Sequence, residues 1–194
     1  MAGTPVEDYQ GSLIHDHEKT FHRYGCGHQE CLAHVLRYLK GSMENEPEPE
    51  RKWNRAMHCL LREMIHYVNG VEPGGEREPV TICGYESRYD QILETALNEY
   101  ADVPCSDYYR DGYNLALRMK EYREAHLLFL HDSRVPATNN LAGRLLRFIK
   151  RKQNPAVSLR SIKSLELLCD SMSVLFLMRK EGGSLYDKVS TVFG

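Results

Sequence analysis

The sequence predicts a mainly helical protein with a small β part of about two short strands. Apolar residues recur at helical spacing over most of the 194 residues, which is the pattern of helices with one buried face. Near the start, residues 12–16 instead form a short apolar segment that ends at a charged residue, which is typical of a buried strand. A hydrophobic content of 42% is enough to build the core of one domain of ordinary size, with or without a helical insertion.

The first quarter of the chain contains the strand and two expected helices. Residues 1–11 form a polar lead, and residues 18–24 predict a short helix that Gly25 ends. A longer helix is expected to run through about Met43. Residues 44–50 are acidic and contain two prolines, so they read as a solvated linker.

The middle of the chain has the strongest helical patterns. Residues 51–69 and 85–100 are each expected to form a helix, separated by a glycine- and proline-rich loop over residues 70–79. A long helix then runs from about residue 108 or 113 to 131, with an interruption expected at Gly112. The apolar face of the first of these helices comprises Trp53, Met57, Leu60, Leu61, Met64, Ile65 and Val68.

The C-terminal third predicts three more helices. Pro136 blocks a helix before it, and Thr138 or Asn139 can cap the helix that follows. Apolar residues over 165–176 predict a buried helix that ends near the glycines at 182 and 183. Ser184 can cap a last short helix that ends at Phe193. The apolar face of the first of the three comprises Leu141, Leu145, Phe148 and Ile149.

Composition excludes several classes of protein. A net charge of -2 argues against a protein that is basic over its whole surface, so any site for DNA must be a local patch. No apolar run is long enough to span a bilayer, and the N-terminus lacks the basic and apolar regions of a signal peptide. The six cysteines are then expected to be reduced, and the protein to be cytoplasmic.

A local excess of positive charge follows Gly143. Residues 144–163 contain seven basic side chains and no acidic one. Such a cluster attracts phosphate backbones independently of base sequence. The alternative is a solvated helix face that pairs with acidic neighbours. The seven residues are Arg144, Arg147, Lys150, Arg151, Lys152, Arg160 and Lys163.

Two sets of side chains near the start can bind metals. Asp16, at the end of the expected strand, is a possible Mg²⁺ ligand, because hard cations take oxygen ligands; the alternative is a carboxylate that caps a turn. Cys26, His28, Cys31 and His34 form a C-x-H-x2-C-x2-H pattern that could hold zinc. The alternative for this pattern is a buried Cys31 and a hydrogen-bonded His34.

Residues 134–147 resemble the glutamate-bearing motif of the insertion-sequence sixty-six transposases, R-V-P-x-T-N-N-x-A-E-R-x-L-R. Every fixed position of the motif matches except one: Gly143 stands where the family has the glutamate of its Asp-Asp-Glu metal-binding triad. The stretch around Asp16 resembles the family's strand with the second catalytic aspartate, and Cys31, His34 and Arg37 resemble its C-x-x-H signature, which supports the active site.

The resemblance implies a remnant of an RNase H-like α/β core, formed by residues 1–43 and 132–194, with a helical insertion over residues 44–131. The family's first aspartate lies on an upstream strand, and this chain begins after that region. Asp16 would then be vestigial, and the Mg²⁺ of the parent family would not be held. Asn139 and Asn140 would lie beside the DNA contacted by the basic helix.

The expected function is therefore that of a catalytically inactive transposase fragment that retains DNA binding. The alternative is an exapted mobile-element protein that binds and inhibits or regulates another protein, such as a nuclease. The open edge of strand 12–15 would be covered by residues 1–11, by helices or by that partner. A third interpretation is an active metal-dependent enzyme with Glu18 or Asp132 as replacement carboxylates.

Overall fold

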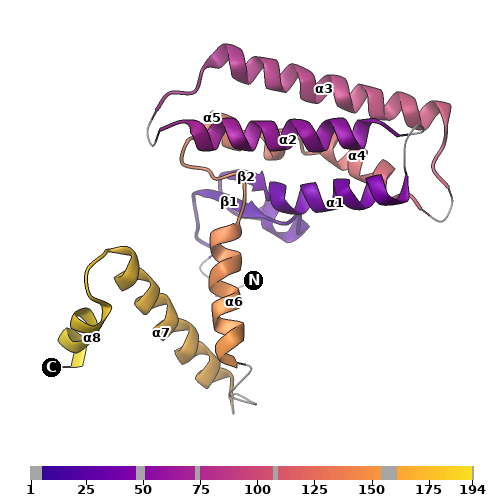
Figure 1. Ribbon diagram of the computed structural model, residues 1–194. Helices are drawn as coiled ribbons and strands as arrows, with labels where there is room; N and C mark the ends of the chain where they lie inside the picture. Colours follow the sequence, from indigo (N-terminus) through magenta and orange to yellow (C-terminus); the bar gives the residue numbers. More distant parts are fainter. Residues whose placement is uncertain (1–5, 47–50, 73–74, 107–108, 154–160, 194) are drawn as a thin grey trace. The chain divides into compact units, whose positions relative to one another are not determined.

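The computed structural model describes residues 6–46, 51–72, 75–106, 109–153 and 161–193 (Figure 1). The described residues form eight α-helices, one short 3-10 helix and a two-stranded sheet, so the predicted class, mainly α with a small β part, is confirmed. The chain divides into two compact units, Met1–Asn139 and Asn140–Gly194. Within the described residues, no helix combines the length and apolarity needed to cross a membrane.

The sheet lies at the start of the first unit. Strand β1 (Ser12–His15) pairs in parallel with strand β2 (Gly27–Glu30), so that His15 lies opposite Glu30. The 3-10 helix η1 (Lys19–Arg23) connects them and is followed by Gly25, whose φ of 75° suits glycine. The predicted strand and short helix are confirmed. The sequence did not place β2, because Gly-His-Gln-Glu has no alternation of apolar residues.

Five helices complete the first unit: α1 (Leu32–Asn45), α2 (Trp53–Gly70), α3 (Pro79–Asp102), α4 (Asp111–Glu121) and α5 (Arg123–His131). Figure 1 shows α2 lying between α1 and α3, against both of which it packs. The predicted helices are confirmed here, although α3 begins earlier than expected. Pro79 is accepted at the start of α3 because the first turn of a helix does not need its N–H.

The expected interruption of the last long helix was placed wrongly. The break falls at Tyr122, between α4 and α5, whereas Gly112 lies inside the first turn of α4. Gly112 is buried against Tyr100, Glu46 and Ser42, where a Cβ would not fit. The glycine therefore serves close packing and does not end a helix.

The core of the first unit draws residues from all five helices and includes the predicted apolar face of α2. The five most buried members of that face have no solvent exposure, and the large rings of Tyr89 and Phe129 are equally buried. Ile65 and Val68 pack partly buried against the same core. These five residues are Trp53, Met57, Leu60, Leu61 and Met64.

The second unit contains α6 (Asn140–Gln153), α7 (Ile162–Lys180) and α8 (Leu185–Phe193). Gly182 and Gly183, with φ of 78° and 82°, end α7 as expected, and Ser184 Oγ accepts a hydrogen bond from Asp187 N (3.3 Å) at the start of α8. The predicted burial of α7 was wrong, since none of its residues is buried among those described. Its apolar side chains are distributed around the whole helix, so α6 and α8 cover only part of them.

Candidate functional site

Asp16 is an exposed residue directly after β1. The next residue, His17, has a φ of 69°, a left-handed conformation that turns the chain from the strand towards η1. Burial lowers the pKa of the His34 imidazole and Arg37 lowers it further, while the Asp16 carboxylate opposes them. The structure therefore brings Asp16, His34 and Arg37 into one electrostatic neighbourhood at the end of β1.

The residues around Asp16 do not fit the magnesium ions of an Asp-Asp-Glu enzyme. Two-metal phosphoryl transfer needs several carboxylates around two cations. Among the described residues, no group of three or more ligand side chains includes Asp16. The suggested replacement carboxylates form local hydrogen bonds instead: Glu18 Oε1 accepts from Thr20 Oγ1 (2.8 Å), and Asp132 Oδ1 accepts from the Arg134 backbone N (2.9 Å).

Cys31 and Leu32, where α1 begins, hold residues 135–139 of the R-V-P-x-T-N-N motif, here called the motif segment. Leu32 N donates a hydrogen bond to Ala137 O (2.9 Å), and Asn139 N donates to Cys31 Sγ (3.3 Å). Both Cys31 and Val135 are buried, with 1% and 4% exposure. The cysteine thiol thus anchors a segment more than one hundred residues away in the sequence.

The structure does not bring together the four predicted zinc ligands. Cys26 is exposed and its thiol donates to Gln10 Oε1 (3.6 Å), whereas Cys31 is buried against the motif segment. The groups of three or more possible ligands among the described residues include His28 but not Cys26, Cys31 or His34. His34 Nδ1 is buried and has no hydrogen-bond partner among these residues.

A buried carboxylate that the sequence did not reveal lies at the end of β2. Glu30 is 1% exposed; its Oε1 is 2.5 Å from His17 Nδ1, and its Oε2 is 3.2 Å from His126 Nε2 and 3.8 Å from Arg118 Nε. Burial alone would raise the pKa of this carboxyl, but the hydrogen bonds and charges of His126 and His17 lower it to about 2. Glu30 is therefore a buried anion that joins β2 to the turn after β1, to α4 and to α5.

The polar contacts continue from Glu30 into the core. Tyr89 Oη donates to Met119 O (3.0 Å) and lies 3.0 Å from His126 Nδ1. The neighbouring Gln29 donates to His126 O (3.3 Å) and accepts from Phe129 N (2.8 Å). These bonds fix β2 against α5. Gln29 and Glu30 are the last two residues of β2, and no spacing in the sequence marks this pair as buried.

The basic residues of α6 are exposed in the second unit. Of the predicted DNA-binding side chains, Arg144, Arg147, Lys150 and Arg151 are exposed, while those of Lys152 and Arg160 lie outside the described residues. In the described part of the chain, none of the four forms an ion pair with a carboxylate, and Arg147 Nε donates to Gly143 O (3.1 Å). Lys163 is exposed on α7.

The two motif asparagines flank the boundary between the units. Asn139 is partly buried at the end of the first unit, and Asn140 is exposed as the first residue of α6. Gly143 lies one turn into α6. A Cβ built there would meet only Arg147 Nη2, at 3.9 Å, which is an ordinary contact. Packing in the described residues therefore leaves room for a side chain at the position of the triad glutamate.

Comparison with known proteins gives one match. The family model described as "Transposase IS66 family" matches residues 1–166, which include Asp16, the C-x-x-H signature and the R-V-P-x-T-N-N motif. No curated protein and no solved structure matched the chain. The family model covers most of the sequence, with the motifs in the family's order. The chain therefore belongs to the IS66 transposase family.

Proposed function

We propose that this chain is a catalytically inactive, transposase-derived protein that retains DNA binding through α6. The observation that carries the proposal is the exposed row of cations on that helix. Arg144, Arg147 and Arg151 are spaced i, i+3 and i+7, so they lie on one face of α6. They extend over about 10 Å of helix axis, a length along which a DNA duplex presents several phosphate charges.

The proposed inactivity follows from the ligands that the chain supplies. Gly143 has no side chain to hold a metal, and Asp16 belongs to no group of three or more possible ligands among the described residues. An enzyme that joins or cleaves DNA by two-metal catalysis needs such ligands to neutralise charge at the attacking and leaving oxygens. In an Mg²⁺-dependent nicking or strand-transfer assay, the purified chain is expected to give no product.

Binding to a labelled DNA duplex at several salt concentrations tests the DNA interaction. The wild-type affinity is expected to fall steeply with salt, because each neutralised phosphate releases counterions. Replacing Arg144, Arg147 and Arg151 with alanine should weaken binding and reduce the slope of log affinity against log salt by about 3. No binding at low salt would refute the proposal.

A matched control removes the same charge elsewhere. Lys40, Arg62 and Lys120 are exposed on three different helices of the first unit. Their triple alanine variant should keep the wild-type salt slope. If both triple variants lost affinity equally, net charge alone would explain the binding, and α6 would not be the site.

The free edge of the sheet favours a second function, which is binding of another protein that adds a strand to it. Within the described residues β1 pairs only with β2, so the other edge of β1 has no strand partner. A regulated protein such as a nuclease could add a strand there. Inhibition of that nuclease by both the wild type and the α6 triple variant would favour this function, whereas inhibition lost in the variant would indicate competition for DNA.

For either function we place the protein in the cytoplasm, since its six cysteines are free thiols.

A further inference from the structure

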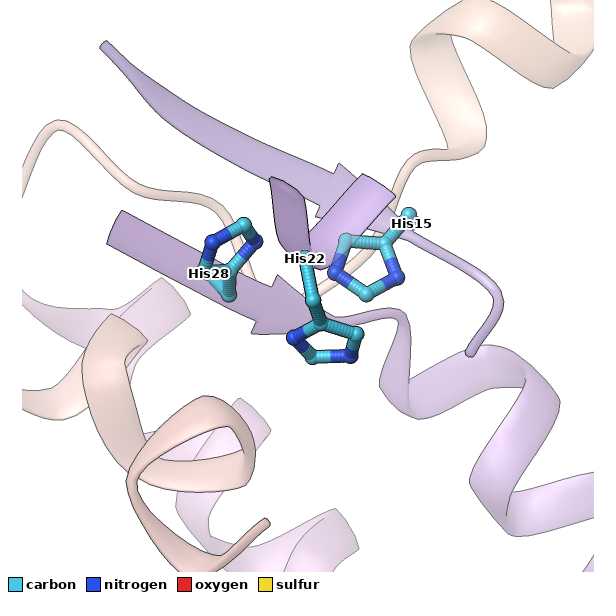
Figure 2. Close-up of side chains that lie close together, drawn as sticks. All are labelled: His15, His22 and His28. Atoms are coloured by element: carbon cyan, nitrogen blue, oxygen red, sulfur yellow. The ribbon is translucent and has the colours of Figure 1, made fainter. Parts of the chain in front are cut away.

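Three histidines from consecutive segments of the first unit meet beside the sheet. His15 is the last residue of β1, His22 belongs to η1, and His28 lies in β2 (Figure 2). Their ring centroids are 4.7 Å (His15–His22), 4.8 Å (His22–His28) and 5.5 Å (His15–His28) apart. One ring nitrogen from each lies within 4.8 Å of the other two. Figure 2 shows the rings converging from the three segments on one small volume.

The nitrogens of this histidine cluster (His15, His22 and His28) lack the partners that buried polar atoms usually have. Both ring nitrogens of His15, Nε2 of His22 and Nδ1 of His28 are buried with no hydrogen-bond partner among the described residues. Leaving such groups unsatisfied costs free energy, and native proteins rarely do so without a bound water, ion or ligand. Four such nitrogens in one place are therefore ligand atoms that the described residues leave unused.

The protonation of the cluster suits the binding of a cation. Burial lowers the pKa of all three imidazoles, and the neighbouring rings lower that of His15 further, to about 4. At neutral pH the rings are uncharged, so each offers a lone pair and none repels a cation. Hard Mg²⁺ prefers oxygen ligands, whereas imidazole suits zinc, copper and nickel.

We propose that His15, His22 and His28 bind one divalent transition-metal ion of the zinc class. A tetrahedral zinc with bonds of about 2.0–2.1 Å holds its ligand nitrogens about 3.4 Å apart, so small ring rotations would complete the site. Three protein ligands leave the fourth position to water. The site is separate from α6 and would exist whether or not the protein binds DNA.

A second arrangement, His17, His22 and Glu30, is also compact but less available. Glu30 Oε1 is already engaged by His17 Nδ1 at 2.5 Å, and Glu30 Oε2 by His126. A metal there would have to displace these contacts. At the histidine cluster, the unpartnered nitrogens have no hydrogen bond to another described residue that a metal would need to break. His22 belongs to both groups, so variants of His15 and His28 distinguish them.

Bound metal would join β1, η1 and β2, the short segments that hold Asp16 and Glu30 in place. Because it binds only the folded chain, it should stabilise that chain by mass action. With Zn²⁺ at one hundred times its dissociation constant, the Tm should rise by about 5–10 °C. Mg²⁺ at the same concentration should leave the Tm unchanged.

Titration of untagged, metal-free protein tests the site. Calorimetry with Zn²⁺ should give one ion per chain, and Co²⁺ should give the visible absorption of a tetrahedral site that Zn²⁺ then abolishes. His22→Gln and His28→Gln, confirmed as folded by circular dichroism, should each weaken Zn²⁺ binding by more than about tenfold. Because neither side chain is fully buried, at least one variant is expected to remain folded.

Two control variants make the outcome decisive. His66→Gln removes an exposed histidine of α2 and should bind Zn²⁺ as the wild type does. Cys26→Ser removes a ligand of the C-x-H-x2-C-x2-H pattern and should also leave binding unchanged. The proposal is overturned if the wild type binds no Zn²⁺, if either His22→Gln or His28→Gln binds it normally, or if Cys26→Ser abolishes binding.

Discussion

Replacing Glu30 with alanine is expected to lower the free energy of unfolding by about 3–5 kcal/mol, the range found when one partner of a buried ion pair is removed. Glu30 is buried, and it faces His17 of the turn after β1, Arg118 of α4 and His126 of α5. Without the carboxylate, the His126 ring, which has no solvent exposure, loses the group that its Nε2 faces. Urea denaturation followed by circular dichroism measures the change.

Two further variants separate charge from shape. Glu30→Gln keeps the volume and an acceptor oxygen but removes the negative charge, so a smaller loss of about 1–3 kcal/mol is expected. Glu124 lies close to His126 along α5 but is exposed. Glu124→Ala should therefore change the free energy of unfolding by no more than about 0.5 kcal/mol. Equal effects of Glu30→Ala and Glu124→Ala would show that the buried contacts contribute nothing specific.

The helices were predictable because their signal is local. The apolar face of α2, with Trp53 and Met57 one turn apart, follows directly from the helical period and is buried as expected. The same reasoning failed on α7, whose apolar face suggested burial but has no fully buried residue among those described. A periodic pattern shows that a helix has apolar residues; it does not show that a neighbour large enough to cover them exists.

The polar sites were not predictable in the same way, because they depend on contacts between distant segments. Gln29 and Glu30 reach His126, nearly one hundred residues further along the chain, and no sequence spacing encodes that approach. The compact C-x-H-x2-C-x2-H pattern suggested zinc ligands by proximity alone. In the structure, β2 takes His28 to the side of His15, while α1 takes Cys31 to the motif segment.

The family was recognisable because its motif is a continuous stretch. Residues 134–147 match the fixed positions of the IS66 pattern apart from Gly143, and the family model covers this stretch. What the motif does in this chain depends instead on side-chain geometry. Exposure of Arg144 and Arg147 on α6 is compatible with DNA, whereas the surroundings of Asp16 provide no cluster of carboxylates among the described residues.

Alanine is expected to have opposite effects at two helical glycines. At Gly112, in α4, a Cβ would overlap Glu46 Oε2 and Tyr100 Oη and lie 2.8 Å from Ser42 Oγ. It would break the hydrogen bond that Tyr100 Oη donates to Glu46 Oε2 (2.8 Å). The guanidinium group of the buried Arg51 lies over the same Tyr100 ring. We expect Gly112→Ala to destabilise the first unit by about 1–3 kcal/mol, despite the better helix propensity of alanine.

At Gly143, in α6, only the gain in helix propensity remains. The added methyl group would meet Arg147 Nη2 at 3.9 Å, so Gly143→Ala should stabilise α6 by about 1 kcal/mol. Thermal unfolding measures the Gly112 variant, and amide hydrogen exchange of residues 140–153 measures the Gly143 variant. A destabilising Gly143→Ala would mean that a contact in the intact protein requires the glycine.

Gly143→Glu extends the comparison to the residue that the family motif has at this position. Glutamate four residues before Arg147 forms a favourable helical pair, worth about 0.3–0.5 kcal/mol, and no described neighbour obstructs it. The variant should therefore fold at least as stably as the wild type, yet remain inactive in the strand-transfer assay, because Asp16 still has no cluster of carboxylates around it in the described residues. That result would show that fold stability does not maintain glycine at position 143, and that restoring one ligand does not restore a two-metal site.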